Sequence, residues 1–203
     1  INGIFSLGSA NIDNSNNTIT GCRIFDFFNA ASTSIGIHIN AANALSSTAW
    51  TITNNRLYQT GTRLYTTANT HQGIFVGVGS GYTITGNIIG FADANSGGLY
   101  RMIGNSVDLS GFPSSYAPTG TANATRYVAI GAAFTAGGAN SIIQGNTIAG
   151  FALYTSSGAT TTNGILCGVN LTAGNATISN NTIGATSGTG SIYTVCTTSG
   201  GVV

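Results

Sequence analysis

The stretch "ATISNNTIGA", residues 176–185, has no charge and no aromatic ring, and an isoleucine stands on either side of its Asn-Asn pair. Its centre recurs as Ile, any residue, Gly or Asn, Asn (Cys in the first copy), any residue, and Ile or Leu. The five copies are ITGCRI (19–24), ITNNRL (52–57), ITGNII (84–89), IQGNTI (143–148) and ISNNTI (178–183). Their first isoleucines are 33, 32, 59 and 35 residues apart. Such a period is the signature of a repeat architecture, and the long step holds one period plus an insertion of roughly 25 residues.

A second apolar stretch precedes each copy. These stretches are GIFSL (3–7), GIHIN (36–40), GIFVGV (73–78), VAIGAAF (128–134) and GILCGV (164–169). Short runs of Ile, Val and Thr in alternation favour strands over helices. The sequence therefore predicts a strand, a turn of variable length and a second strand, repeated five times. Alternation directs Ile52 inward and its neighbours Thr51 and Thr53 outward.

Two columns of the repeat predict how the coils are held together. The first column contains residue types that tolerate a left-handed backbone, and so predicts a tight bend: Gly21, Asn54, Gly86, Gly145 and Asn180. The next column is the predicted structural ladder: Cys22, Asn55, Asn87, Asn146 and Asn181. Stacked coils bring these side chains about 4.8 Å apart. Each amide is then expected to donate to one neighbour and accept from the other.

The composition excludes several classes of partner. Charged residues are 4% of the chain, Lys and Glu are absent, and the net charge is +1. We therefore expect no binding of nucleic acid or of an anionic membrane surface. No apolar run approaches the roughly 20 residues that span a bilayer, so no membrane span is expected. The start, INGIFSLG, lacks the pattern of a signal peptide, so we expect either that one was removed or that the chain is cut from something longer.

The acidic residues do not form a catalytic pattern. Glycoside hydrolysis commonly uses two carboxylates roughly 5 to 10 Å apart, and calcium needs several oxygen ligands. The four aspartates share no repeat column, and no lysine is present to act as a base: Asp13, Asp26, Asp93 and Asp108. We expect a protein that is not an enzyme and has no catalytic residues, no cofactor and no metal.

The histidines and cysteines are expected to be structural or exposed. His38 alternates with inward isoleucines and should point outward, and His71 precedes a strand, so both are interpreted as surface or loop residues. Cys167 is interpreted as an inward side chain of GILCGV. Cys196 lies about one coil later, so a disulfide between the two is conceivable, and buried free thiols are the alternative.

Two loops are candidates for contact with a partner. The insertion GNSVDLSGFPSSYAPTGTANATRY (104–127) contains Phe112, Tyr116 and Arg126, and SSTAW (46–50) contains Trp50, the one tryptophan of the chain. Long loops on a rigid scaffold often carry function. The alternative is that these residues pack on the flank of the coils themselves.

The columns resemble those of the right-handed parallel β-helix, the pectate-lyase-like solenoid. A further match joins SGGLYRMIGNS (96–106) and GTGSIYTVCTTSGG (188–201), since both follow an Ile-Gly step and lead from glycines into an apolar strand with tyrosine. The phrasing TISNNTIG…SGTGSI…TSGG resembles the repeats of very large secreted surface proteins of the Bacteroidota. Those include gliding-motility adhesins and filament proteins exported by the type IX system. The resemblance implies an extracellular or cell-surface location.

We therefore expect an all-β, right-handed parallel β-helix (a β-solenoid) of about six coils. Residues 1–203 are expected to form one continuous segment of a longer array, or a subunit that stacks end to end. The expected function is a structural or adhesive section of an extracellular filament or giant adhesin, with further repeats, copies of itself, surface glycans or other cells as partners. Two alternatives remain: a carbohydrate-active or glycan-binding β-helix, and an ice-binding solenoid that uses the outward TIT threonines at 18–20, 51–53 and 83–85.

Overall fold

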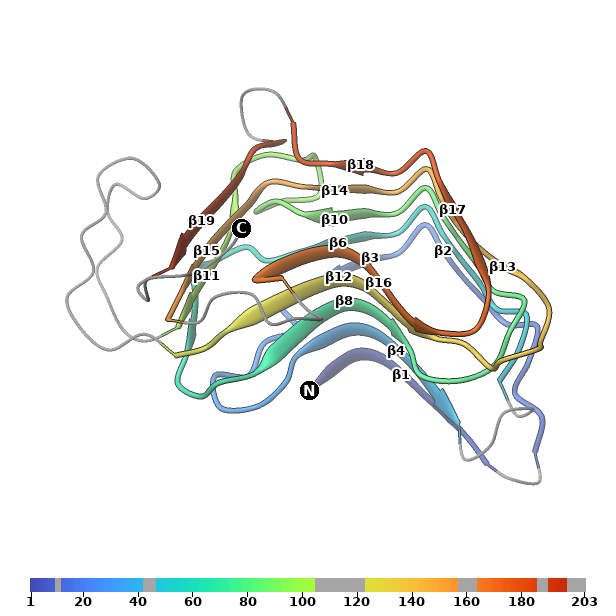
Figure 1. Ribbon diagram of the computed structural model, residues 1–203. Coiled ribbons are helices and arrows are strands. Elements are labelled where there is room, and N and C mark those ends of the chain that lie inside the picture. Colours follow the sequence, from blue (N-terminus) through green and yellow to red (C-terminus); the bar gives the residue numbers. More distant parts are fainter. Residues whose placement is uncertain (10–11, 42–46, 105–122, 157–163, 186–189, 197–203) are drawn as a thin grey trace.

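The computed structural model describes residues 1–203 except 10–11, 42–46, 105–122, 157–163, 186–189 and 197–203. The chain winds in successive coils, and each coil lays its strands beside those of the coil before (Figure 1). All strand pairs are parallel, and each joins one coil to the next, for example β1 to β4 and β5 to β9. The predicted all-β parallel solenoid is confirmed.

Four parallel sheets form the walls of the solenoid. Sheet 1 contains β1 (Asn2–Gly8), β4 (Ile35–Ala41), β8 (Thr70–Val76), β12 (Arg126–Ala133) and β16 (Leu166–Ala173). Sheet 2 contains β2 (Thr18–Thr20), β5 (Thr51–Thr53), β9 (Thr83–Thr85), β13 (Ser141–Gln144) and β17 (Ala176–Ser179). Sheet 3 contains β3 (Arg23–Phe25), β6 (Arg56–Tyr58), β10 (Ile88–Gly90), β14 (Thr147–Ala149) and β18 (Thr182–Ile183). Sheet 4 contains β7 (Arg63–Tyr65), β11 (Tyr100–Gly104), β15 (Phe151–Thr155) and β19 (Ile192–Cys196).

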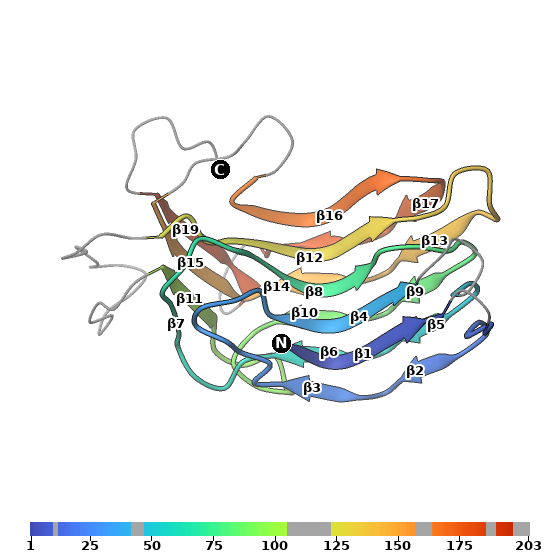
Figure 2. The ribbon, with the colours of Figure 1, turned by 90° about the horizontal axis from the view of Figure 1, so that it is seen from below.

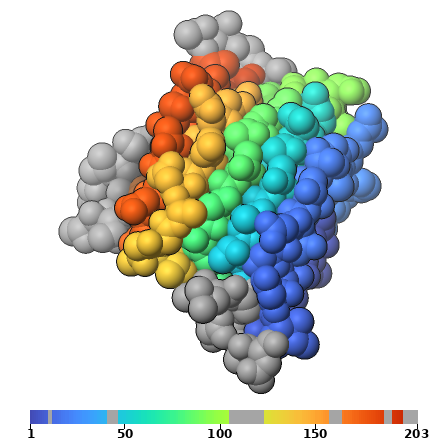
Figure 3. Space-filling view, turned by 90° about the vertical axis from the view of Figure 1, so that its right-hand side faces the viewer, coloured from blue at the N-terminus to red at the C-terminus, as the bar shows by residue number. Residues whose placement is uncertain are grey.

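The described residues form five coils, where the sequence predicted about six. Figure 2 shows the sheet 1 strands in their spatial order, and Figure 3 shows the coils as adjacent bands along one face. Within the described part of the chain, the first coil contributes no strand to sheet 4. The strands of the two tyrosine-containing matches, β11 and β19, both lie in sheet 4, each paired with β15.

One predicted strand has a different register. The sequence placed the last long strand at 164–169 and aligned it on Ile165, but β16 covers Leu166–Ala173 and pairs Val169 with Ile130. Gly168 and Val169 repeat the small-then-apolar pair of Gly73 and Ile74. An added Cβ at Gly168 would lie 2.4 Å from Ile183 Cδ1, so this position, like the equivalent Ala129 and Gly73, holds a small residue.

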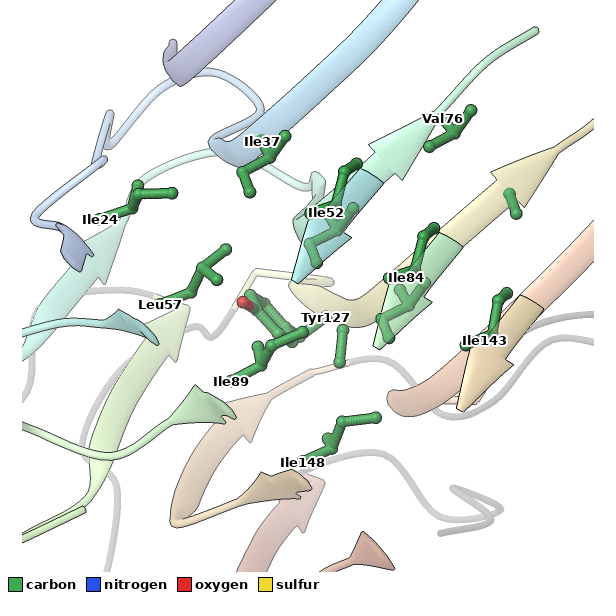
Figure 4. Close-up of a cluster of buried hydrophobic side chains, with 14 of the residues drawn as sticks. Ile24, Ile37, Ile52, Leu57, Val76, Ile84, Ile89, Tyr127, Ile143 and Ile148 are labelled. Atoms are coloured by element: carbon green, nitrogen blue, oxygen red, sulfur yellow. The ribbon is translucent and has the colours of Figure 1, made fainter. Parts of the chain in front are cut away.

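The core consists of apolar columns that run along the solenoid. Ile52 pairs in register with Ile19 and Ile84, and Leu57 pairs with Ile24 and Ile89. Ile52, Leu57, Ile84 and Ile89 are almost completely buried (Figure 4). Burying such a side chain contributes about 1.5–3 kcal/mol, so the stacked columns are the main apolar contribution to stability.

A column of small residues lets sheet 1 approach sheet 3. At Gly36 an added Cβ would lie 2.5 Å from Leu57 Cδ2, and at Gly73 it would lie 2.6 Å from the carbonyl oxygen of Ala129 and 2.9 Å from Ile89 Cγ2. Real Cβ atoms do not approach a backbone oxygen so closely. The small residue before each inward apolar residue, glycine in most coils and Ala129 in β12, thus permits the close packing of opposite walls.

The close approach at Gly73 makes a testable prediction. We expect Gly73→Ala to lower the free energy of unfolding by about 1–3 kcal/mol, because the added methyl group overpacks the interior. Gly61→Ala is the matched control, since an added Cβ there has no neighbour within 4 Å. The free energies are measured by urea unfolding. A Gly73→Ala protein as stable as the control would contradict the packing described here.

Candidate functional site

The corner between sheets 2 and 3 is bent in the same way in every coil. Its first residue has a positive φ throughout, between 54° and 66°: Gly21, Asn54, Gly86, Gly145 and Asn180. This is the left-handed region, which Gly and Asn tolerate best. The structure thus places the bend where the first predicted column lies.

The second residue of the corner forms the ladder. The Oδ1 of Asn87 accepts hydrogen bonds from the backbone N–H (3.0 Å) and the Nδ2 (3.0 Å) of Asn55 in the preceding coil. The Nδ2 of Asn87 donates to the Oδ1 of Asn146 in the next coil (2.9 Å) and to the carbonyl oxygen of Ile52 (2.8 Å). All four hydrogen-bonding positions of this amide are therefore used.

The same pattern continues along the column. Asn146 donates from its backbone N–H (3.0 Å) and its Nδ2 (2.9 Å) to the Oδ1 of Asn181, and Asn55 donates from its Nδ2 to the carbonyl oxygen of Ile19 (2.9 Å). Asn55, Asn87 and Asn146 are completely buried. The sequence pattern pointed to contacts between amides, but it did not reveal that each Oδ1 also accepts a backbone N–H.

Cys22 takes part in the ladder through its backbone alone. Its N–H donates to the Oδ1 of Asn55 (3.0 Å), and its Sγ lies 3.5 Å from the carbonyl oxygen of Thr20. A thiol lacks the second donor and the strong acceptor of an amide. The ladder therefore loses its side-chain contribution in the first coil.

Cys22 and Cys167 are free thiols, so Cys167 is not bonded to Cys196. Cys167 pairs with Val128, a residue that lines a cavity on the outer face of sheet 1, and not with the inward column. The inward orientation predicted for Cys167 is wrong, because the shifted register of β16 puts Val169 in that column. Partial burial raises the pKa of the Cys167 thiol, and a hydrogen bond with the backbone of Val169 partly offsets the rise.

The candidate contact residues have different positions. Trp50 is buried in the core, and its Nε1 donates to the carbonyl oxygen of Asn14 (2.6 Å), so it packs on the coils themselves. Arg126 begins β12, and its backbone N–H donates to the carbonyl oxygen of Asn69 (3.0 Å). Phe112 and Tyr116 lie outside the described residues.

The two histidines differ sharply. His38 points outward as predicted, with its ring centroid 5.1 Å from that of Phe5 and 5.3 Å from that of Phe75. His71 is completely buried, so its assignment to the surface or a loop is wrong. The cause is the length of β8, which starts at Thr70 and carries His71 into the interior.

His71 lies against a cluster of tyrosines that the sequence did not reveal. Its ring centroid is 3.8 Å from that of Tyr65, and its Nδ1 accepts a hydrogen bond from the backbone N–H of Ser34 (3.1 Å). Burial, with a smaller contribution from the positive N-terminus, lowers the pKa of His71 to about 3. The Tyr65 and Tyr100 hydroxyls are 3.2 Å apart, and burial raises the pKa of both. These tyrosines occupy different positions of the repeat, so the periodicity of the sequence does not reveal that they lie together.

Two carboxylates stabilise turns. Asp26 forms an ion pair with Arg63 and accepts two hydrogen bonds from Thr60. Partial burial tends to raise the pKa of Asp26, but these hydrogen bonds and the Arg63 charge outweigh it and lower the pKa. Asp93 accepts from the backbone N–H groups of Asn95 (2.7 Å) and Gly97 (2.9 Å). In the part of the chain that the structure describes, no group of three or more His, Cys, Asp and Glu side chains is arranged to hold a metal ion.

The outer face of sheet 1 carries a small cavity of about 200 Å³. Its lining includes the ring of Phe75, the side chains of Gln72 and Asn170, and Gly131, whose missing side chain leaves the space open. Phe75 continues the aromatic column of Phe5 and His38. This face is thus the one on which aromatic rings and amides gather beside a cavity.

The comparisons with known proteins identify no relative. No protein-family model matches the chain, no curated protein matches its sequence significantly, and no solved structure matches significantly. In addition, none of the described residues forms a helix long and apolar enough to cross a membrane.

The ladder makes a direct stability prediction. We expect Asn87→Ala to lower the free energy of unfolding by at least about 3 kcal/mol, because two buried donors of Asn55 and the carbonyl of Ile52 lose their partner, at about 1–3 kcal/mol per unsatisfied group. The control is Asn54→Gly, which replaces the neighbouring corner residue by the type found at Gly21, Gly86 and Gly145. We expect it to change stability by less than about 1 kcal/mol. Equal effects in urea unfolding would contradict the role given to the ladder.

His71 makes a pH prediction. Its pKa is about 3 in the folded chain and near 6.5 in the unfolded chain, so the unfolded state binds a proton first as pH falls. The stability is complete above pH 6.5 and is lost as pH falls toward 3. Between pH 7 and pH 5 we expect a loss of about 2 kcal/mol. Urea unfolding of His71→Asn, which keeps an acceptor for Ser34, should lack this loss. His38→Asn is the control and should largely retain it.

Proposed function

We propose that this chain is a structural or adhesive section of an extracellular filament or a giant cell-surface adhesin, and that it is not a catalyst. The observation that carries the proposal is the asparagine ladder, in which the amide of each coil after the first bonds the coil before it. Each further repeat can extend such a ladder with the same asparagine position and the same hydrogen bonds. It suits a rod that extends from a surface better than a compact domain.

The wall structure supports a mechanical role. Parallel sheets join each pair of successive coils, and each added coil extends the rod by about 4.8 Å. Force along the axis is then shared by the hydrogen bonds of all walls and by the ladder. The low charge of the chain, 4% of residues, also lets neighbouring coils pack without like-charge repulsion.

The location and the partners form part of the proposal. The phrasing of the repeats resembles the type IX-exported surface proteins of the Bacteroidota, which supports an extracellular or cell-surface location. The proposed partners are further repeats of the same kind or copies of this chain, with surface glycans or other cells as targets of adhesion. Nucleic acid and membrane lipid are not proposed, since the net charge is +1.

The experiment combines location with mechanics. Antibodies against the folded chain should label intact cells of the source organism by immunogold microscopy, and protease treatment of the cells should remove the label. In single-molecule pulling, Asn87→Ala should unfold at a lower force than Asn54→Gly. A label confined to the cell interior, or the release of sugars from a polysaccharide panel, would contradict the proposal.

A second candidate function, binding of neutral glycans, is favoured by the cavity on sheet 1. Aromatic rings with neighbouring amides are a common means of holding a sugar, since the ring packs on its apolar face while the amides bond its hydroxyls. A cavity of about 200 Å³ beside Phe75 and Gln72 offers both chemistries without charge. On this view the rod itself recognises a glycan.

This candidate is tested by titration calorimetry with neutral oligosaccharides. Phe75→Ala should weaken binding at least about tenfold, which corresponds to the loss of one good contact of 1.4 kcal/mol. Phe25→Ala is the matched control, because Phe25 is an exposed ring that stacks on Tyr58 in sheet 3, with ring centroids 5.1 Å apart. No binding by the unmodified chain, or equal loss in both variants, would exclude this candidate.

A further inference from the structure

The two ends of the coil stack differ in how well their core is covered. Ile19 and Ile24, in the first coil, are 8% and 7% exposed. Ile178 and Ile183, their equivalents in the fifth coil, are 45% and 56% exposed. An open hollow of about 700 Å³ lies beside Ile183, bordered by Gly184 and Ile192. The Ile19 and Ile24 columns are therefore nearly covered at the β1–β3 end, beside a smaller hollow of about 370 Å³ lined by Ile4 and Ile24, and they are exposed at the β16–β19 end.

The first coil also has exposed apolar residues, but none of them belongs to the columns of Ile19 and Ile24: Ile1, Phe5, Leu7, Ile12 and Phe25. Phe5 packs against His38 on the outer face of sheet 1, and Phe25 stacks on Tyr58. Ile178 and Ile183 instead continue the columns of Ile143 and Ile148, which are fully buried. Exposed core columns mark a surface that is complete only when another element covers it.

The ladder is also open at this end. Each Oδ1 faces the preceding coil, so the chemical direction of the ladder is fixed. The Nδ2 of Asn181 donates to the carbonyl oxygen of Ile143 (2.9 Å), which uses one of its two hydrogens. Its second Nδ2 hydrogen and its backbone N–H have no partner among the described residues. Asn146 uses the same two donors to bind the Oδ1 of the next coil. The β16–β19 end thus lacks one hydrogen-bond acceptor, placed to bind both the Nδ2 and the backbone N–H of Asn181.

Charge distinguishes the two ends as well. Arg23, next to Cys22, and Asp26 are exposed in the first coil. From Tyr127 to Val203 the sequence contains no charged residue. Charged side chains at a sheet edge hinder pairing with another chain. The β16–β19 edge lacks this protection.

We propose that the β16–β19 end is a docking surface for one further parallel β-coil that carries asparagine at the ladder position. The Oδ1 of that asparagine accepts both free donors of Asn181, and its flanking isoleucines cover Ile178 and Ile183. This inference rests on the proposed structural function and adds the chemistry and direction of the next contact.

A second copy of this chain is a poorer occupant. Stacked in the same direction, it would bring Cys22 opposite Asn181, and a sulfur is a weak acceptor. In its first coil, Ile19 and Ile24 are also already nearly buried and Arg23 is exposed. Stacked in the opposite direction, it would set the Asn181 donors of the two copies against each other. The ladder therefore selects an asparagine-bearing coil.

The test extends the 203-residue chain by a second copy of residues 164–203. A matched extension carries Asn181→Cys in the appended copy only. Amide hydrogen exchange is followed by NMR at the original Asn181 and at Asn146. In the unextended chain, the Asn181 amide should exchange at least about tenfold faster than that of Asn146, because one hydrogen bond is missing. The asparagine extension should slow Asn181 at least about tenfold, and the cysteine extension should leave it fast.

Four results would overturn the inference. Slow exchange at Asn181 in the unextended monomer would mean that its backbone N–H already has a hydrogen-bond acceptor. An extension that leaves Asn181 fast would mean that no coil docks. Equal protection by both extensions would mean that the ladder does not select the occupant. Sedimentation of the unextended chain is measured in parallel, and self-association that protects Asn181 would make a second copy the occupant. None of these results depends on the location or mechanics of the rod.

Discussion

A buried corner in a coil leaves backbone N–H groups that water cannot reach, and the asparagine side chain satisfies them. The Oδ1 of Asn87 accepts the backbone N–H of Asn55, while its Nδ2 bonds the carbonyl of Ile52. Leaving one such group unpaired costs about 1–3 kcal/mol. An amide combines an acceptor and a double donor on one short stem, and its reach fits the spacing of parallel strands. The amide thus satisfies the buried corner at the spacing that the parallel strands set.

The other regular features serve the same corner. The left-handed residue before each ladder position turns the chain sharply enough to set the amide inside, as Asn54 does before Asn55. The fixed spacing then stacks Ile52 on Ile84, and the small residue at Gly73 brings the opposite wall into contact with Ile89. The left-handed bend, the asparagine ladder and the apolar columns therefore depend on one another. This explains why the chain repeats so uniform a sequence motif.

The features that recur in every repeat could be predicted from the sequence, and those that occur once could not. The bend, the ladder column and the inward isoleucines recur at fixed spacing, so the five copies together revealed them. His71 and Cys167 were placed wrongly because neither recurs: His71 is carried inside by an extension of β8, and Cys167 is displaced by the register of β16. The burial of Trp50 and the tyrosine cluster depend on contacts between irregular connections, for which one sequence contains no periodic signal.

A rod held in this way has a direction, because every side-chain oxygen faces the same end, and a rod with unlike ends suits ordered extension from a surface. The ladder itself can be observed by NMR through scalar couplings across hydrogen bonds. Couplings are predicted from the backbone nitrogens of Cys22, Asn55 and Asn87 to the side-chain carbonyl carbons of Asn55, Asn87 and Asn146, respectively. The absence of all three couplings, in spectra that do show couplings between paired strands, would contradict the account.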